Sequence, residues 1–193
     1  MKLAKFFWIA GSVLINVTIG FYVYLQSKVP ANLVERYQYI NDQWALFGGH
    51  WKAEFLIMAL IAIAALFFAF RFKDVCWTIV VVGQLIILLT YPIMLGGYVN
   101  TTVEMAEMAN QMATVTFVFG NLIFMFGLLV LYFNTELLPK WLKYVAVILA
   151  AASSMLFLLI YVEFTSWGQM LFAAPIINLL YLINAYHGIK MKV

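Results

Sequence analysis

The stretch that decides the fold is AEFLIMALIAIAALFFAFR at residues 53–71, in which only Glu54 near the start and Arg71 at the end are charged. A helix needs about 20 mostly apolar residues to cross roughly 30 Å of hydrocarbon. The stretch therefore predicts a membrane-spanning helix. Five further stretches of this kind bring the predicted spans to six, at residues 6–26, 53–71, 75–97, 111–133, 141–162 and 168–187. Their apolar character is continuous and does not alternate, which favours helices over a β-barrel.

The composition of the whole chain supports a membrane protein. Hydrophobic residues make up 66% of its 193 residues and charged residues only 10%, with a mean hydropathy of +1.00. Soluble domains carry roughly 25% charged residues, so most of this surface must face lipid and a soluble fold is excluded. We expect one all-α, polytopic domain over residues 1–193, surrounded by membrane lipids. The scattered net charge of +3 excludes a nucleic-acid partner.

Basic residues fall unevenly on the two sides of the predicted bundle. Positively charged loops stay in the cytoplasm. If the N-terminus is inside, only Lys28, Arg36 and Lys52 lie outside, whereas six of the eight acidic residues do. This pattern predicts an N-in, C-in topology. The inner basic residues are Lys2, Lys5, Arg71, Lys73, Lys140, Lys143, Lys190 and Lys192.

The longest outer connection, residues 27–52, shows helical periodicity. Apolar side chains recur at spacings of three and four, which predicts an amphipathic helix at the outer interface. We expect Gly48-Gly49 to end this helix before the span at 53–71, and residues 98–110 to extend the span at 111–133 outward. The periodic apolar residues are Leu33, Tyr37, Ile40, Trp44 and Phe47.

Short motifs along the chain resemble those of a known family. The chain has FGNLI at 119–123, LPKWL at 138–142, a glutamate at position 54 in a predicted span, and AYHG at 185–188 where the last span ends. These features resemble a family of bacterial six-helix integral membrane proteins of unknown function. The resemblance implies six helices in a bacterial inner membrane, and it brings no activity, cofactor or site residues.

Polar residues inside the predicted spans are the candidate functional groups. Such groups either bond to neighbouring helices or line a cavity for a small ligand, and both readings stay open. Glu54 follows His50 by one helical turn on the same face, and a carboxylate within an apolar span marks a candidate site. The candidate ligand-binding residues are therefore Asn16, Gln84, Asn121, Asn178, Glu54 and His50.

Other kinds of chemistry have less support. Cys76 is the single cysteine, so disulfides and thiolate-bound metal clusters are excluded, and His50 and His187 lie too far apart to ligate one haem. Met105, Met108 and Met112 form a stripe that fits either a soft metal ion or helix packing. No catalytic motif is present, so we expect no cofactor, no catalytic residues and no enzyme.

The sequence favours a protein that binds or transports a small neutral, amphipathic or cationic molecule. The main alternative is a non-catalytic scaffold or accessory subunit that docks a membrane partner or a second copy. A minor alternative is an enzyme at the outer interface or a soft-metal binder. A cavity among the polar residues would favour binding, and a filled bundle with a flat exposed face would favour the scaffold.

Overall fold

The computed structural model describes residues 1–99, 101–165 and 174–191. These residues form seven α-helices and contain no strand. Five of the helices, α1, α3, α4, α5 and α6, are long and apolar enough to cross a membrane. The chain is therefore an all-helical protein of the polytopic membrane type. The helices are α1 (Lys2–Gln26), α2 (Leu33–Asp42), α3 (Trp44–Phe72), α4 (Val75–Gly97), α5 (Val103–Asn134), α6 (Lys140–Tyr161) and α8 (Ala174–Lys190).

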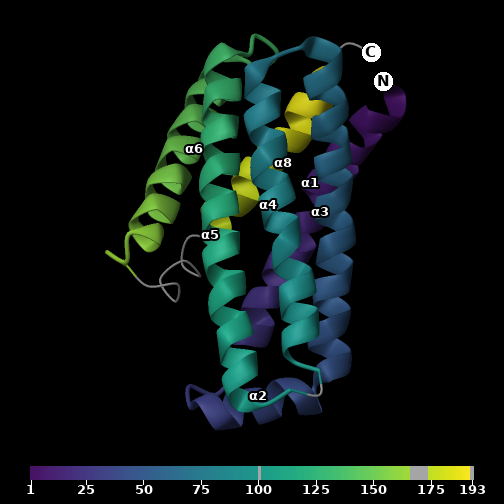
Figure 1. Cartoon of the computed structure of the whole chain (residues 1–193). Helices are drawn as coiled ribbons and strands as arrows, with labels where there is room; N and C mark the ends of the chain where they lie inside the picture. Colours follow the sequence, from purple (N-terminus) through teal and green to yellow (C-terminus); the bar gives the residue numbers. More distant parts are fainter. Residues whose placement is uncertain (100, 166–173, 192–193) are drawn as a thin grey trace.

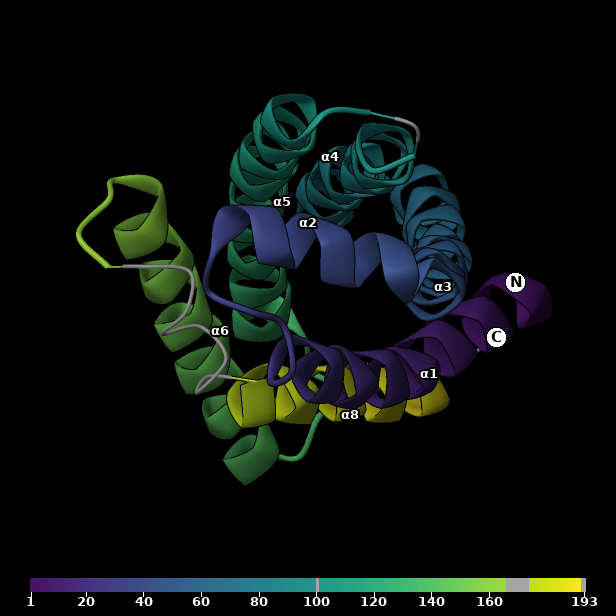
Figure 2. The same cartoon turned by 90° about the horizontal axis from the view of Figure 1, so that it is seen from below.

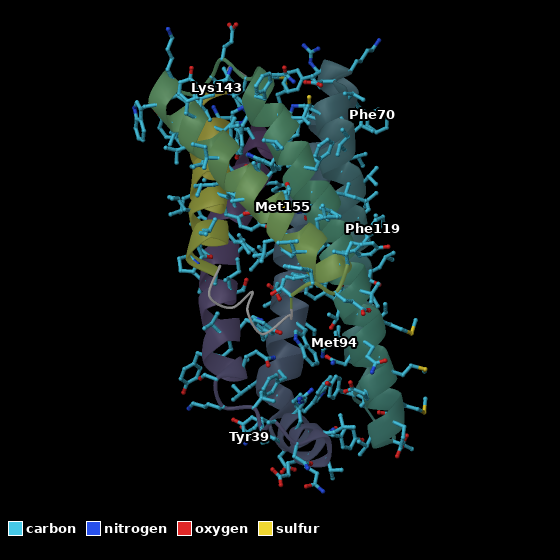
Figure 3. The ribbon with its side chains drawn as sticks, turned by 90° about the vertical axis from the view of Figure 1, so that its left-hand side faces the viewer. Tyr39, Phe70, Met94, Phe119, Lys143 and Met155 are labelled. Carbon is cyan, nitrogen blue, oxygen red and sulfur yellow. The ribbon has the colours of Figure 1, made fainter. Side chains whose placement is uncertain are left out.

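The long helices form a bundle that α2 crosses at one end (Figures 1 and 2). Helix α4 packs against α3 and α5, and α1 packs against α3 and α8, so the first and last described helices are neighbours. Helix α6 leans against the outer side of α5 (Figure 1). Phe70 is 76% exposed and points away from the bundle (Figure 3), as expected for a side chain that faces lipid, whereas the Phe119 ring packs against Tyr161 of α6.

The outer amphipathic helix is shorter than predicted. Helix α2 begins after Asn32, whose side-chain oxygen accepts hydrogen bonds from the backbone of Val34 and Glu35 at 2.9 and 3.2 Å. It ends at Asp42, because Gln43 leaves the helical conformation with φ −103° and ψ 24°. The prediction that Trp44 and Phe47 belong to this helix is therefore wrong, since both lie in α3.

The prediction that Gly48-Gly49 end a helix is also wrong, because both residues lie inside α3. A Cβ atom on Gly48 would lie 2.9 Å from Cε2 of Trp44, one turn earlier. The glycine makes room for this indole and does not form a turn. As a result α3 begins at Trp44 and not at residue 53.

The remaining predicted spans agree more closely with the helices. The span at 75–97 has the bounds of α4, and the span at 6–26 lies within α1. Helix α5 begins at Val103, so part of the segment 98–110 extends it as predicted. The predicted span at 168–187 begins outside the described residues, and its described part belongs to α8.

Glycines bring α4 and α5 into backbone contact. A Cβ atom on Gly83 of α4 would lie 2.4 Å from the backbone nitrogen of Phe124 on α5. A Cβ atom on Gly127 of α5 would lie 2.8 Å from the backbone nitrogen of Val80. Small residues allow membrane helices to approach this closely, and packing contacts then replace the missing hydrophobic driving force.

Three tryptophans near helix ends are buried between helices. Trp8, Trp51 and Trp77 are 0%, 4% and 3% exposed, whereas Trp141 is 68% exposed. Trp8 donates its indole N–H to the backbone oxygen of Asn184 at 2.8 Å, which joins α1 to α8. These three indoles therefore stabilise helix packing and do not face lipid headgroups.

Candidate functional site

A cavity of about 650 Å³ lies beneath α2, on the side of that helix that faces the rest of the bundle. Its wall comes from α1, α3, α4, α5 and α8, and its outer end from α2 and the connection before it. Met94 of α4 lines the cavity and lies between the levels of Phe119 and Tyr39 in Figure 3, in the half of the bundle nearer α2. The volume is within the range of about 300–1,000 Å³ that is usual for small-molecule sites.

Glu54 brings a carboxylate into the wall of this cavity. It lies about 15 Å along α3 from the first residue, Trp44, at 1.5 Å per residue. Its Oε2 is 3.4 Å from Nε2 of His50, one turn earlier, and the two side chains are 12% and 1% exposed. The contact lacks hydrogen-bond geometry. The sequence prediction thus placed the pair correctly on one face of one helix.

His50 itself does not line the cavity. Its ring stacks on Tyr22 with centroids 5.9 Å apart and is tilted against Phe21 at 5.6 Å. These contacts with α1 hold the imidazole between two helices. His50 can therefore position Glu54, whereas Glu54 is the member of the pair that a ligand would meet.

Two tyrosines add buried hydroxyl groups to the same wall. Tyr91 and Tyr181 are 3% and 1% exposed, and the Tyr91 hydroxyl has no hydrogen-bond partner among the described residues, whereas Gln84 lies beside the Tyr181 hydroxyl. Both hydroxyl groups lie within range of an electrostatic interaction with the Glu54 carboxylate. An unpaired buried hydroxyl costs about 1–3 kcal/mol, so bonding to a ligand would stabilise this part of the bundle.

The outer end of the cavity is formed around Arg36 of α2. The guanidinium donates to the backbone oxygen of Ala31 at 3.1 Å, and Nε donates to that of Pro30 at 3.5 Å. Tyr98, which follows α4, lies nearby and lines the cavity too. Burial raises the pKa of the Tyr98 hydroxyl, and the charge of Arg36 opposes that rise. Arg36 therefore holds α2 against the connection that precedes it, at the outer end of the cavity.

The structure separates the four amides that were predicted as ligand-binding residues. Asn121 lines the cavity, and it donates a hydrogen bond to the backbone oxygen of Phe117 at 2.9 Å. Asn16 and Asn178 are not among the lining residues, and Asn16 donates to the backbone oxygen of Ser12 at 2.7 Å. Gln84 is fully buried near Tyr181 but does not line the cavity. Ligand binding by these residues stays a prediction.

Sequence reasoning missed a buried polar group at the other end of the bundle. The Tyr132 hydroxyl donates to Oδ1 of Asn184, and Oγ1 of Thr135 lies 3.1 Å from Nε2 of His187. His187 also lines a second cavity of about 330 Å³ together with Asp74. The spacing of three between Tyr181, Asn184 and His187 on α8 was the available signal.

The methionine stripe points outward. Met105, Met108 and Met112 are 52%, 56% and 54% exposed on α5. Within residues 1–99, 101–165 and 174–191, no group of three or more His, Cys, Asp and Glu side chains could hold a metal ion. The three thioethers belong to the outer surface and not to the cavity beneath α2.

Comparisons with protein-family models, curated proteins and solved structures found no match to this chain. A function is therefore inferred from the geometry of the cavity.

Proposed function

We propose that the protein binds a small amphipathic molecule, neutral or cationic at its polar end, in the cavity beneath α2, and that it does so without catalysis. The observation that carries the proposal is the cavity of about 650 Å³ with Glu54 in its wall. A filled bundle would give its polar side chains no common space. Passage of this molecule to the other side of the membrane is part of the same proposal.

The wall has the division expected for an amphipathic ligand. Polar groups come from Glu54, Tyr91, Tyr181 and Asn121, while Ile19, Val23, Ile40, Met58 and Ile177 contribute apolar surface. Ligand sites of this size combine a mostly apolar lining with a few placed polar groups. The polar groups would fix the head of the ligand, and the apolar side chains would contact its hydrocarbon part.

Native mass spectrometry of protein extracted in a mild detergent tests this proposal directly. We expect one small amphiphile to remain bound through purification and to be released on denaturation. Lipid extracts of the same membranes provide the control. A bound fraction with the composition of the bulk membrane lipids would contradict a defined ligand.

We also propose six spans with both ends inside, in a bacterial inner membrane. Helix α8 would be the sixth span beside the five long helices, since its 17 residues measure about 25 Å. Support comes from the basic residues, because Lys143 lies at the end of the bundle opposite to Tyr39 of α2 (Figure 3). That end would face the cytoplasm.

Cysteine labelling in intact cells tests the topology. In a background without Cys76, we expect an impermeant thiol reagent to modify a cysteine at Thr102, which lies outside under this topology, and to leave one at Leu137 unmodified. Both native side chains are exposed, so accessibility in the folded protein does not distinguish them. Permeabilised cells, in which both positions should react, are the control. Labelling of position 137 alone in intact cells would show that the topology is the opposite of the one proposed.

The alternative, a non-catalytic scaffold or accessory subunit, is favoured by α6. This helix packs mainly on α5, and an outward stripe of Trp141, Tyr144 and Ile148 is 68%, 68% and 65% exposed. A partner helix or a second copy would bind there. Alanine at Tyr144 and Ile148 should then dissociate the complex while the mass of any molecule bound in the cavity is unchanged.

A further inference from the structure

We propose that the ligand of this cavity carries a positive charge, and that Glu54 and neighbouring aromatic side chains bind it as an ammonium group. The inference rests on the proposed function, because it names the class of ligand for the same cavity. It follows from the charge balance around Glu54, from the kind of side chains beside it, and from their fixed positions.

Among the residues that the structure describes, no fixed cation lies beside the carboxylate of Glu54 on its cavity side. A charge in an apolar environment is costly unless it is paired. Lys52 is exposed and lies two positions earlier on α3, so it faces another direction. His50 approaches one carboxylate oxygen at 3.4 Å, but it is held against Tyr22 and does not line the cavity.

Arg36 also lines the cavity, but it lies at the outer end. Its guanidinium is engaged by the backbone oxygens of Pro30 and Ala31. It lies on α2, which crosses the bundle where α3 begins, and about 15 Å of helix separates that level from Glu54. The two charges therefore lie at different levels of one cavity, and the negative one lies deeper.

Aromatic rings surround the same cavity. Tyr22, Trp51, Tyr91 and Tyr181 line it together with Glu54, from four different helices. Aromatic faces attract cations, and cages of such rings bind quaternary ammonium groups. An anionic head would gain nothing from these faces and would be repelled by the carboxylate. A neutral head would leave the carboxylate without a partner.

The rings are held by further aromatic contacts. Trp51 packs against Tyr98 with centroids 5.5 Å apart, Tyr91 against Phe55 at 5.9 Å, and Tyr181 against Phe124 at 5.9 Å. Rings that are fixed in advance lose little entropy when a ligand binds. The arrangement therefore fits an alkylammonium, whose head would lie at Glu54 and whose chain would contact Met58 and Ile177.

Two probes with the same chain separate charge from hydrophobicity: hexyltrimethylammonium and 1-hexanol. We expect calorimetric titration of the protein in maltoside micelles to show at least about tenfold tighter binding of the ammonium. Glu54→Gln should remove this preference and leave the affinity for 1-hexanol unchanged. Glu104→Gln, which alters an exposed carboxylate outside the cavity, is the matched control and should keep the preference.

Tyr91 provides a second variant that does not depend on Glu54. Tyr91→Phe keeps the ring and should retain tight binding of hexyltrimethylammonium, whereas Tyr91→Leu should weaken it by at least about threefold. Equal affinity of the unchanged protein for both probes would overturn the ammonium proposal and leave a neutral amphiphile as the ligand. Binding of neither probe would contradict the proposed function itself. These two results need no variant, so they hold even if a substitution prevents folding.

Discussion

Gly83→Ala is expected to destabilise the bundle by about 3 kcal/mol or more, because overpacking at a rigid contact cannot be relieved by a side-chain movement. The added methyl group would lie 2.4 Å from the backbone nitrogen of Phe124 and 2.6 Å from its Cα. Helices α4 and α5 would have to separate at this backbone contact. For a chain of this length, about 3 kcal/mol corresponds to a decrease in Tm of about 6–12 °C, measurable by thermal unfolding in detergent.

Gly96→Ala on the same helix is the matched control. An alanine there would meet no atom within 4 Å outside the helix itself. Alanine has the higher helix propensity by about 1 kcal/mol, so Tm should stay the same or rise. A decrease of similar size in both variants would mean that helix propensity, and not the contact between α4 and α5, determines the effect.

Asn121→Leu is expected to abolish ligand binding with little change in stability. Leucine removes the polar atoms that Asn121 presents to the cavity and occupies part of its volume. The variant also loses the hydrogen bond to Phe117, but such bonds in membranes contribute only about 0.6 kcal/mol on average. Native mass spectrometry should show the bound amphiphile reduced at least about tenfold, while Tm changes by less than about 3 °C.

Asn16→Leu tests whether ligand binding depends on an amide in the cavity wall or on the loss of any buried amide. Asn16 also donates to a backbone oxygen four residues earlier, but it does not line the cavity. The two variants therefore remove the same kind of hydrogen bond, and only one changes the cavity wall. We expect Asn16→Leu to retain the ligand. Equal retention in both variants would show that the ligand binds elsewhere.

The helical class could be predicted because continuous apolar stretches have one stable form in a bilayer. Helix boundaries were less predictable where packing overrides local preference. Gly48 reads as a helix breaker, yet it lies inside α3 because the ring of Trp44 needs the space of a missing side chain. The apolar spacing from Leu33 to Phe47 also crosses Gln43 without interruption, so periodicity alone could not show the break between α2 and α3.

The candidate site was predicted only in part. Glu54 and Asn121 stood out because charged and amide groups are rare within apolar stretches, and both line the cavity. Tyr91 and Tyr181 did not, because a tyrosine in a membrane protein usually indicates an interface. Which amides share a space depends on the rotation of each helix in the bundle. That rotation follows from contacts such as Gly83 against Phe124, which no single stretch of sequence reveals.

The pairing of α1 with α8 has a consequence for biosynthesis. Trp8 and Asn184 are 176 positions apart, and a ribosome that adds about 5–20 residues per second needs roughly 10–35 s to reach the second after the first. During this interval the indole N–H of Trp8 has no acceptor from α8, and the basic group of Lys5 cannot reach the backbone oxygen of Met191. The first helix to enter the membrane is thus among the last to complete its packing. A nascent chain interrupted before α8 would leave both groups without these acceptors, and cellular quality control acts on such incompletely packed chains.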